Sequence, residues 1–467
     1  MKVLFTNTNY QRRVEYTSLI SVVPPLELAY GAALVRERLP GVEVGIIDAN
    51  VEDLTEKEHA RRIREAGPDV LVFWAATYSI NSVSRLTRSL RGDVSWMVLA
   101  GPHGTALPED VMAEIPGIDV VIRGEIEHPV LELVKALESG GPLAGVKGIH
   151  FRENGVIRHT EDDTRAKDID SLPFPARDLL PNHLYSSPYS SRVTALRTTR
   201  GCPGRCRFCD SHLLVGHRTR TRDPAAVADE IEECVGRYGT DYFAVIDHTF
   251  TARRSFVTAV CSEITRRGLN RRIRWACNTR VDMLSDEMLA VMRGAGCLQI
   301  GIGIESADNA RLSAVGKGIT EDQIRDAIRR IKRHGIIAMG YTIIGFPTDS
   351  AESIRRTRDR ILEFDPHTLQ LSFATPLPGT ELRRECLEQD RILSDDWDDY
   401  VFLRRSIIRN DTLSTSELER LRRDIVKRFY FRPGKLVRLI AFLMFRARPS
   451  YVSALRAGLK VISNVNK

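Results

Sequence analysis

Three cysteines lie within one short segment, Cys202-Pro-Gly-Arg-Cys206-Arg-Phe-Cys209. Three residues separate the first pair and two separate the second, a spacing that suits three thiolate ligands of a four-iron, four-sulfur (4Fe-4S) cluster. The segment supplies no fourth ligand. One iron would therefore stay open, and an open iron can bind a substrate instead of only passing electrons.

The same cysteines could instead hold zinc, because His212 and His217 lie near enough in the chain to complete a four-ligand set. The triplet spacing is not typical of zinc knuckles, which disfavours this interpretation. A disulfide framework is also disfavoured, because the chain is long and shows no signal peptide. The five remaining cysteines occur singly and are expected to be apolar core residues: Cys234, Cys261, Cys277, Cys297 and Cys386.

The whole segment Thr199–Cys209, with Phe208 before the last cysteine, resembles the cluster loop of the radical S-adenosyl-L-methionine (SAM) enzymes. The resemblance implies that Cys202, Cys206 and Cys209 bind the 4Fe-4S cluster and that Phe208 lies at the SAM site. It also implies that the open iron binds the amino and carboxylate groups of SAM. An electron from the cluster would then cleave a carbon–sulfur bond and give a 5′-deoxyadenosyl radical.

Strand and helix patterns alternate from residue 192 onward, which predicts parallel βα units. Six such units suit a partial, TIM-like (β/α)6 barrel, the fold that the resemblance implies, with functional groups at the carboxyl ends of the strands. The strands are expected at 192–199, 242–247, 273–278, 298–305, 336–345 and 368–375, and the helices at 224–238, 254–267, 285–295, 321–334 and 350–364.

Several residues at the ends of these strands are assigned to SAM by the same resemblance. Glu305-Ser306 ends a glycine-rich strand and precedes Lys317-Gly318, which implies contact with the SAM ribose or carboxylate. From composition alone, Ser306 could be a helix cap beside a solvated Glu305. Arg280 could fork onto the SAM carboxylate or form a surface pair with Asp282. The other candidates are Asp247, Thr249, Ile343 and Gly345.

The chain departs from the family pattern at two strand ends. The second strand ends in Asp247-His-Thr249, where many members carry Gly-Gly-Glu for the SAM amino group, so Asp247 or Thr249 is the expected substitute. Thr348-Asp349 stands where Gly-Glu is more common, after the segment whose backbone is expected to face adenine. The turn Pro376-Leu-Pro-Gly379 after the sixth strand is either a functional strand end or only a loop signal.

The first 145 residues show a second α/β pattern, which predicts a doubly wound, Rossmann-like sheet with ligands at the carboxyl strand ends. No G-x-G-x-x-G follows the first strand, so a dinucleotide site is disfavoured. The strands are expected at 1–7, 42–48, 70–75, 96–100 and 120–122, and the helices at 26–37, 56–66, 81–90, 108–114 and 128–139.

Three strand-end segments of this region, 76–79, 101–109 and 123–127, carry small and hydroxyl residues that would let a flat ligand approach the backbone. Placed before a radical SAM barrel, they resemble the cobalamin-binding domain of the cobalamin-dependent radical SAM enzymes. The cobalamin contacts that the resemblance implies are Thr77, Tyr78, Ser79, Gly101, Pro102, His103, Thr105, Gly124 and Glu125.

A histidine ligand for cobalt is missing from its usual motif. The D-x-H-x-x-G motif of other cobalamin proteins appears here only as Asp365-Pro-His367, within the barrel and without the glycine. Cobalamin is therefore expected to receive no ligand from this motif, as in many relatives. His103 is either an alternative ligand or a loop residue hydrogen-bonded to backbone or cofactor.

Residues 146–190 are expected to link the two domains through a hairpin that turns at Asn154-Gly155 and a stiff, proline-rich stretch. Residues 191–390 are assigned to the barrel and 391–467 to a helical C-terminal domain. Its segment 421–467 has twelve Lys or Arg and one acidic residue, Asp424, and predicts basic amphipathic helices. These helices either pack on the barrel or contact a membrane surface or an acidic, lipid-like substrate.

The composition, 467 residues with a net charge of +7 and 43% hydrophobic residues, suits two or three domains with apolar cores. No apolar run approaches ~20 residues, so no membrane span is expected. The basic C-terminal segment alone does not indicate nucleic acid. A cytoplasmic location is expected, because an oxygen-sensitive cluster needs a reducing compartment, and flavodoxin or ferredoxin is the expected electron donor.

Together the resemblances imply a cobalamin-dependent radical SAM methyltransferase that acts on an unactivated carbon of a small molecule. The radical would remove a hydrogen from the substrate, and the substrate radical would take the methyl group of methylcobalamin. Two alternatives stay open: a cyclisation or ring rearrangement with the same cofactors, and a non-catalytic cobalamin or iron–sulfur sensor. Tyr341, Phe373 and Trp397 are candidates for the substrate pocket, although core packing is the more common role of such residues.

Overall fold

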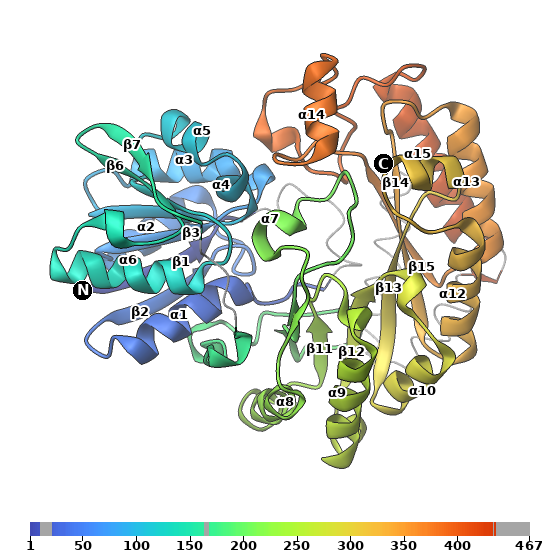
Figure 1. The fold of residues 1–467 in the computed structure, drawn as a ribbon, viewed down its shortest axis with the longest axis horizontal. Coiled ribbons are helices and arrows are strands. Elements are labelled where there is room, and N and C mark those ends of the chain that lie inside the picture. Colours follow the sequence, from blue (N-terminus) through green and yellow to red (C-terminus); the bar gives the residue numbers. More distant parts are fainter. Residues whose placement is uncertain (10–20, 163–167, 433, 436–467) are drawn as a thin grey trace.

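Two main sheets organise the computed structural model, which describes residues 1–9, 21–162, 168–432 and 434–435 (Figure 1). The N-terminal sheet and its helices form one side of the molecule, and the second sheet with its helices forms the other. Helix α7 (Ser211–Val215) lies between the two sides.

The N-terminal sheet has the strand order β2-β1-β3-β4-β5-β6-β7, with β1 to β5 parallel. This order reverses between β1 and β3, the point where doubly wound sheets bind ligands at their carboxyl edge. The strands are β1 (Lys2–Asn7), β2 (Glu43–Asp48), β3 (Val70–Trp74), β4 (Trp96–Ala100) and β5 (Val120–Ile122), and the helices are α1 (Leu26–Arg38), α2 (Glu56–Ala66), α3 (Ile80–Ser89), α4 (Pro102–Ala106), α5 (Pro108–Glu114) and α6 (Glu127–Ser139).

Both faces of this sheet are buried, which explains its almost continuous apolar strands. Successive side chains of β1 point to opposite faces: Val3 and Phe5 pack with residues of α1 and α6, whereas Leu4 packs with residues of α2, α3 and α5. The expected doubly wound sheet is therefore confirmed. One expected loop differs, because residues 102–106 form the short helix α4, which Pro102 begins at its first turn.

The expected hairpin consists of β6 (Ile149–Glu153) and β7 (Val156–His159) and extends the N-terminal sheet antiparallel to β5. Asn154 and Gly155 both have positive φ, as a tight two-residue hairpin turn requires. These two residues were sufficient to predict the turn from the sequence. The docking of the hairpin against β5 depends on a sheet edge that no local pattern reveals.

The second sheet is all-parallel, with the order β15-β14-β13-β12-β11-β8, and it has two free edge strands, as a partial barrel does. Its outer face is covered by helices such as α12, whose Ile324, Ile328 and Ile331 form one buried stripe. The strands are β8 (Val193–Leu196), β11 (Tyr242–Val245), β12 (Arg274–Thr279), β13 (Cys297–Glu305), β14 (Ile337–Ile344) and β15 (Thr368–Phe373), and the helices are α8 (Pro224–Tyr238), α9 (Arg254–Arg266), α10 (Asp286–Gly294), α11 (Asn309–Ala314), α12 (Glu321–Arg333) and α13 (Ala351–Phe364).

The strand expected at 192–199 is interrupted. Thr198 donates to the Asp247 carboxylate through its backbone N–H (2.8 Å) and its hydroxyl (2.5 Å), which turns the chain out of the barrel sheet after β8. The following β9 (Thr199–Arg200) pairs antiparallel with β10 (Arg220–Thr221). This two-stranded sheet closes the base of the loop that carries the three clustered cysteines.

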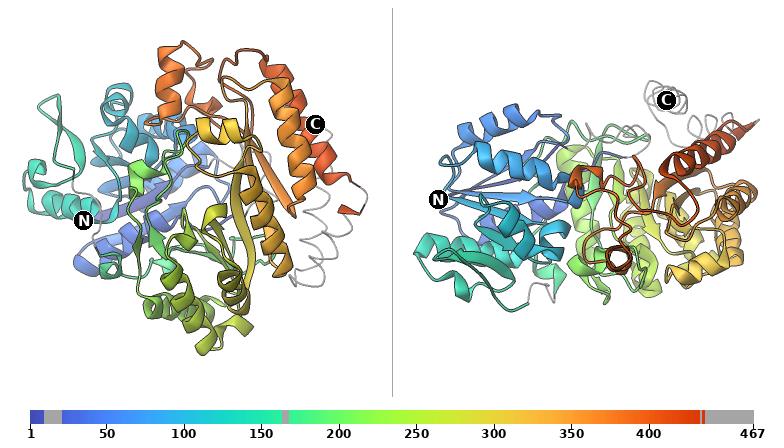
Figure 2. Two further views of the ribbon diagram at one scale, coloured as in Figure 1. Left: turned by 45° about the vertical axis from the view of Figure 1, so that its right-hand side comes forward. Right: turned by 90° about the horizontal axis from the view of Figure 1, so that it is seen from above.

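The C-terminal elements are α14 (Glu381–Glu388) and α15 (Thr415–Tyr430). Figure 2 shows α15 on the side of the barrel away from the N-terminal domain. Leu418, Ile425 and Phe429 of α15 are buried against strands β14 and β15 and helix α13, so the basic segment packs on the barrel as far as Tyr430. Residues 436–467 lie outside the described residues. Within the described ranges, no helix is both long and apolar enough to cross a membrane.

Candidate functional site

The loop between β9 and β10 is shaped by a close backbone crossing at Gly201. Its φ is +103°, and a Cβ there would lie 2.1 Å from the Arg218 carbonyl oxygen. The next residue, Cys202, donates its N–H to the Gly216 carbonyl (3.0 Å). Only glycine fits this crossing, and it returns the chain so that Cys202, Cys206 and Cys209 face one space.

The three cysteines are half-buried and line a cavity of about 150 Å³. The cavity suits the expected 4Fe-4S cluster, because three thiols line it and no fourth cysteine is among the described residues of its wall. The other wall residues are Gly204, Arg205, Arg207, Ser211, His212, His217, Gly379 and Glu381.

The zinc interpretation fits this loop poorly. The Nδ1 atoms of His212 and His217 lie 3.1 Å from the carbonyl oxygens of Cys209 and Gly204, and the two rings stack at 5.2 Å. Within the described ranges, the cysteines and histidines of the loop do not gather closely enough to hold a single ion. The five other cysteines are buried in apolar clusters of the barrel, as expected.

Burial raises the pKa of Cys206, and it raises the pKa of Cys209 to about 11. Without metal, the Cys206 and Cys209 thiols therefore keep their protons at neutral pH, and metal binding must release them. Two hydroxyls contact the sulfurs: Thr249 Oγ1 lies 3.3 Å from Cys202 Sγ, and Ser211 Oγ lies 3.1 Å from Cys209 Sγ.

The two candidates after β11 have different surroundings. Thr249 touches a cluster cysteine, whereas both oxygens of the Asp247 carboxylate are bound by Thr198. Asp247 therefore positions the strand that leads into the cluster loop, and its direct role toward SAM stays a prediction. His248, which the sequence analysis left unassigned, lies between them with a buried Nδ1 that has no hydrogen-bond partner. Burial, followed by the charge of Arg197, lowers its pKa to about 4.

Glu305 and Lys317 form a buried ion pair at the end of β13, with 2.7 Å between Nζ and Oε1. Glu305 has a φ of +56°, uncommon for a residue with a side chain, and strained backbone of this kind often marks functional sites. Burial alone would lower the pKa of Lys317, but the charges of Glu305 and Cys206 raise it above its ordinary value. Lys317 therefore stays charged beside the cluster loop.

Gly303→Ala is expected to weaken SAM binding roughly tenfold to a hundredfold by displacing this pair. A methyl group at residue 303 would lie 2.3 Å from Glu305 Oε1 and 2.4 Å from Lys317 Nζ. Both atoms end flexible side chains, so they can move while the fold survives. The dissociation constant for SAM, measured by equilibrium dialysis of cluster-loaded protein, tests this. Gly236→Ala in α8, where a Cβ meets nothing within 4 Å, is the control. Equal affinities for SAM in the wild type, Gly303→Ala and Gly236→Ala would mean that Glu305 does not contribute to SAM binding.

Two other SAM candidates already have protein partners. The Arg280 guanidinium forks onto Asp282 (3.0 and 3.1 Å) and donates to the Lys317 carbonyl (2.7 Å), with Nη1 beside Gly204 of the cluster loop. Ser306 shares a hydrogen bond with Thr357 of α13 (3.2 Å), away from the cysteines. These contacts explain the positions of Arg280 and Ser306 without SAM, and their SAM contacts stay predictions.

The departure at Asp349 has a structural role. Its carboxylate accepts hydrogen bonds from the backbone N–H groups of Gly345 (2.8 Å) and Phe346 (3.0 Å) and pairs with Arg311 (2.8 Å). Asp349 thus fixes the turn after β14. The two remaining candidates, Phe208 and Ile343, pack with Phe346 in one apolar cluster.

On the N-terminal side, the strand-end segments are bound closely to one another. Gly101 has a φ of +111°, and a Cβ there would lie 2.6 Å from the Ala75 carbonyl oxygen. The Thr105 hydroxyl donates to the Gly101 carbonyl (2.8 Å) and accepts from the Gly124 N–H (3.0 Å). The segments after β3, β4 and β5 therefore form one connected surface at the carboxyl edge of the sheet.

His103 is a buried polar side chain of this surface, and one of its ring nitrogens has no hydrogen-bond partner within the described residues. It is 2% exposed, its Nδ1 has no hydrogen-bond partner, and its ring meets the edge of Trp397 at 4.8 Å. Burial, followed by the charge of Arg383, lowers its pKa to about 4, so it is neutral at pH 7. An unpartnered buried nitrogen fits a polar group of a cofactor, and His103, with the buried Thr77 and Ser79 of the same strand-end surface, would hold cobalamin.

The other histidine considered for cobalt lies elsewhere. His367 precedes β15 in the barrel, and its Nδ1 accepts the Ala338 N–H (3.0 Å). Asp365 is bound by Lys332, Arg432 and Lys435. The Asp365-Pro-His367 segment is therefore a structural part of the barrel, and the absence of a cobalt ligand from it stays a prediction.

Glu125 connects the two domains. Its carboxylate pairs with Arg220 of β10 (3.1 Å) and lies 3.2 Å from Arg200 of β9, which also pairs with Glu127 (2.5 Å). Burial alone would raise the pKa of Glu127, but the Arg200 charge holds it below its ordinary value. Sequence reasoning assigned Glu125 to cobalamin and missed these arginines. Their positions at the base of the cluster loop mean that the pairs fix this loop against the N-terminal domain.

Gly379, in the turn after β15, lies where the two domains meet. Its φ is +76°, and a Cβ there would lie 2.4 Å from Leu213 in α7 and 3.4 Å from Ala106 in α4. Helices α4 and α7 are in contact beside it. Because α4 carries His103 and α7 follows Cys209, this turn brings the two candidate cofactor sites together.

Comparisons with known proteins agree with the two expected cofactor-binding domains. The model of the radical SAM superfamily matches residues 196–361, and the model of the B12 binding domain matches residues 16–134. An uncharacterized methyltransferase of Pyrococcus horikoshii is 34% identical over 421 residues, which cover 89% of each chain. The anaerobic magnesium-protoporphyrin IX monomethyl ester cyclase of Cereibacter sphaeroides is 30% identical over 92% of this chain and 71% of its own.

Among solved structures, the radical SAM methyltransferase TsrM from Kitasatospora setae, with cobalamin and a 4Fe–4S cluster bound, has a TM-score of 0.73. The alignment covers 100% of this chain and 99% of that chain at 15% identity. At this identity the likeness concerns the fold, and it extends over both domains and the C-terminal elements.

Proposed function

Because the chain belongs to the cobalamin-dependent radical SAM enzymes, we propose that it methylates an unactivated carbon of a small molecule. When bound, the cluster with SAM and the cobalamin supply a carbon-centred radical and a methyl group. The observation that carries the proposal is the contact between the two candidate cofactor surfaces, which Arg200 and Arg220 hold together through Glu125 and Glu127. A substrate between these surfaces can reach both cofactors.

The residues of this chain have distinct tasks in the proposed reaction. Cys202, Cys206 and Cys209 hold the cluster and leave one position for SAM. The Glu305–Lys317 pair orients SAM from the end of β13, and His103 contacts cobalamin from α4. Packing around Phe346, which includes Phe208, keeps water from the radical on the barrel side.

The relatives also favour a second candidate, ring formation with the same cofactors. The cyclase of Cereibacter sphaeroides matches 92% of this chain, and the Pyrococcus horikoshii methyltransferase matches 89%. The two candidates share the radical step and differ in whether the product gains a methyl group. A label on the SAM methyl group therefore separates them.

The test is an anaerobic incubation of cluster- and cobalamin-loaded protein with reductant, SAM that carries a trideuterated methyl group, and a small-molecule extract of cells. Mass spectrometry is expected to find a labelled product together with 5′-deoxyadenosine, and omission of cobalamin should abolish the label. Formation of 5′-deoxyadenosine with an unlabelled product would favour ring formation. Absence of 5′-deoxyadenosine would contradict both candidates and favour a sensor.

The proposal also includes two partners, an electron donor and a membrane or lipid-like substrate. Flavodoxin or ferredoxin delivers the electron, and the protein works in the reducing cytoplasm, where such donors and an oxygen-sensitive cluster coexist. The half-buried position of the cluster cysteines supports electron delivery from outside.

Because α15 packs on the barrel, contact of the basic segment with a membrane or a lipid-like substrate is proposed only for residues 436–467, which are outside the described ranges.

A further inference from the structure

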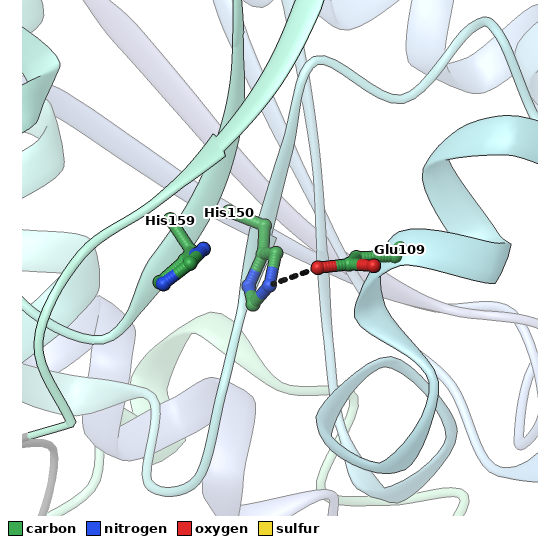
Figure 3. A group of neighbouring side chains, drawn as sticks. All are labelled: Glu109, His150 and His159. Carbon is green, nitrogen blue, oxygen red and sulfur yellow. Dashed lines mark ion pairs between the residues drawn. The ribbon is translucent and has the colours of Figure 1, made fainter.

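Three potential metal ligands converge on the N-terminal domain, at the end of the strand-end segment 101–109. Figure 3 shows His150 from β6 and His159 from β7 beside Glu109 from α5. One ligand atom from each side chain can be chosen so that all three lie within 4.8 Å of one another. The roles assigned above to the cluster, SAM and cobalamin use none of these three residues.

The fold places the two histidines together for a simple reason. His150 and His159 are partners in the register of the hairpin, and side chains of directly opposite residues lie on the same face of a sheet. Their rings are 5.4 Å apart. Arg152, two residues after His150 and thus on the same face, donates to the Met112 carbonyl in α5. This face of the hairpin therefore packs toward α5, which carries Glu109.

His150 has the properties of an available ligand. It is 5% exposed, its Nδ1 has no hydrogen-bond partner, and its Nε2 lies 3.9 Å from Glu109 Oε1. Burial, followed by the charges of Arg123 and His159, lowers its pKa to about 4. The ring is therefore neutral at pH 7 and keeps a free lone pair.

The charged groups around His150 are compatible with a bound cation. Arg123 faces His150, but it pairs with Asp162 and donates to the Thr160 carbonyl (2.5 Å). The Glu109 carboxylate supplies the negative charge on the other side, and its side chain is 72% exposed. The exposed His159 and Glu109 can therefore rotate, while the buried His150 stays fixed.

We propose that Glu109, His150 and His159 bind a divalent first-row transition-metal ion such as Zn²⁺. Two imidazoles and one carboxylate are common ligands of zinc at about 2.0–2.2 Å. Around a tetrahedral ion such ligand atoms lie roughly 3.3 Å apart, so the exposed Glu109 and His159 must move inward by a small distance. Three protein ligands leave one position for water. The ion would connect the hairpin β6–β7 to α5 and so stabilise this edge of the N-terminal domain.

The experiment uses the full-length chain, loaded with cluster and cobalamin, freed of loosely bound metal and dialysed anaerobically against Zn²⁺. The variants Glu109→Gln and His159→Asn change exposed ligands and leave the core intact. His183→Asn removes an exposed histidine elsewhere and is the matched control. Bound zinc is counted by mass spectrometry, its ligands are identified by X-ray absorption, and thermal unfolding is followed with and without zinc.

Wild-type protein and His183→Asn are expected to bind one zinc ion each through nitrogen and oxygen ligands at about 2.0–2.2 Å, and zinc should raise their unfolding temperature. Glu109→Gln and His159→Asn are expected to weaken binding at least about tenfold and to lose the zinc-dependent rise. A sulfur shell near 2.3 Å would assign the zinc to the cluster cysteines and overturn the proposal. Equal binding by all four proteins, or no binding by the wild type, would also overturn it.

Discussion

The Cys206→Ala protein is expected to hold no complete four-iron cluster and to form no detectable 5′-deoxyadenosine from SAM. Two thiols remain after this substitution, and three are needed to hold three irons while the fourth binds SAM. The folded structure is expected to survive, because Cys206 is half-buried in a loop whose shape depends on the Gly201 crossing and the β9–β10 pair. The expected loss of activity is therefore a loss of the cofactor.

Iron and sulfide analysis after anaerobic reconstitution, together with the electron paramagnetic resonance spectrum of the reduced protein, measures the first effect. Chromatography of 5′-deoxyadenosine measures the second. Cys386→Ala, which removes a thiol from the apolar cluster near α14, is the matched control and should keep both cluster and activity. A Cys206→Ala protein with a full complement of iron and sulfide would mean that another side chain ligates the cluster, and it would refute the three-cysteine site.

The sequence was most informative where one local pattern decides the structure. The repeated strand and helix patterns predicted every strand of the barrel sheet and the five parallel strands of the N-terminal sheet within a few residues, because a buried parallel strand needs a continuous apolar run. The cysteine spacing predicted a loop with three thiols around one space, and Gly201 explains how the loop achieves it.

Sequence patterns were least informative where distant residues decide. Arg200 and Glu127 are separated by 73 positions, and nothing near either residue indicates the pair. The same holds for Asp247, whose carboxylate looked available for SAM until the structure placed Thr198 against it. A buried charged residue takes whatever partner the tertiary fold brings to it. Charged residues at strand ends are therefore the candidates whose roles a sequence alone assigns least well.

The contacts between the domains also join distant residues that no local pattern indicates, and the linker is the clearest example. Arg177 of the proline-rich linker is buried and donates to the Ala195 carbonyl of β8 (2.8 Å) and to Glu230 of α8 (2.6 Å). Arg222, after β10, donates to the other oxygen of the same carboxylate. One carboxylate thus binds the linker, the barrel and the strand that closes the cluster loop.

Glu230→Gln is expected to destabilise the protein by about 3–5 kcal/mol at pH 7, because it leaves the buried Arg177 without its charged partner. Burial alone would raise the pKa of Glu230, but the charges of Arg177 and Arg222 hold it below the ordinary value of 4.5. A carboxyl whose pKa is lower in the folded state stabilises the fold at any pH above its ordinary pKa. The difference between wild type and variant should therefore be constant near neutrality and shrink as the pH falls below about 4.5.

Denaturant unfolding of both proteins in the same cofactor state, at pH 7 and at a series of acidic pH values, measures this difference. Glu233→Gln replaces an exposed glutamate on the same helix and is expected to change the stability by less than about 0.5 kcal/mol. If Glu230→Gln unfolded at the wild-type midpoint, the arginines would be stabilised by solvent or by other partners, and the linker would not depend on this carboxylate. If the two glutamine variants were equally destabilised, the effect would belong to α8 as a helix and not to the buried ion pairs.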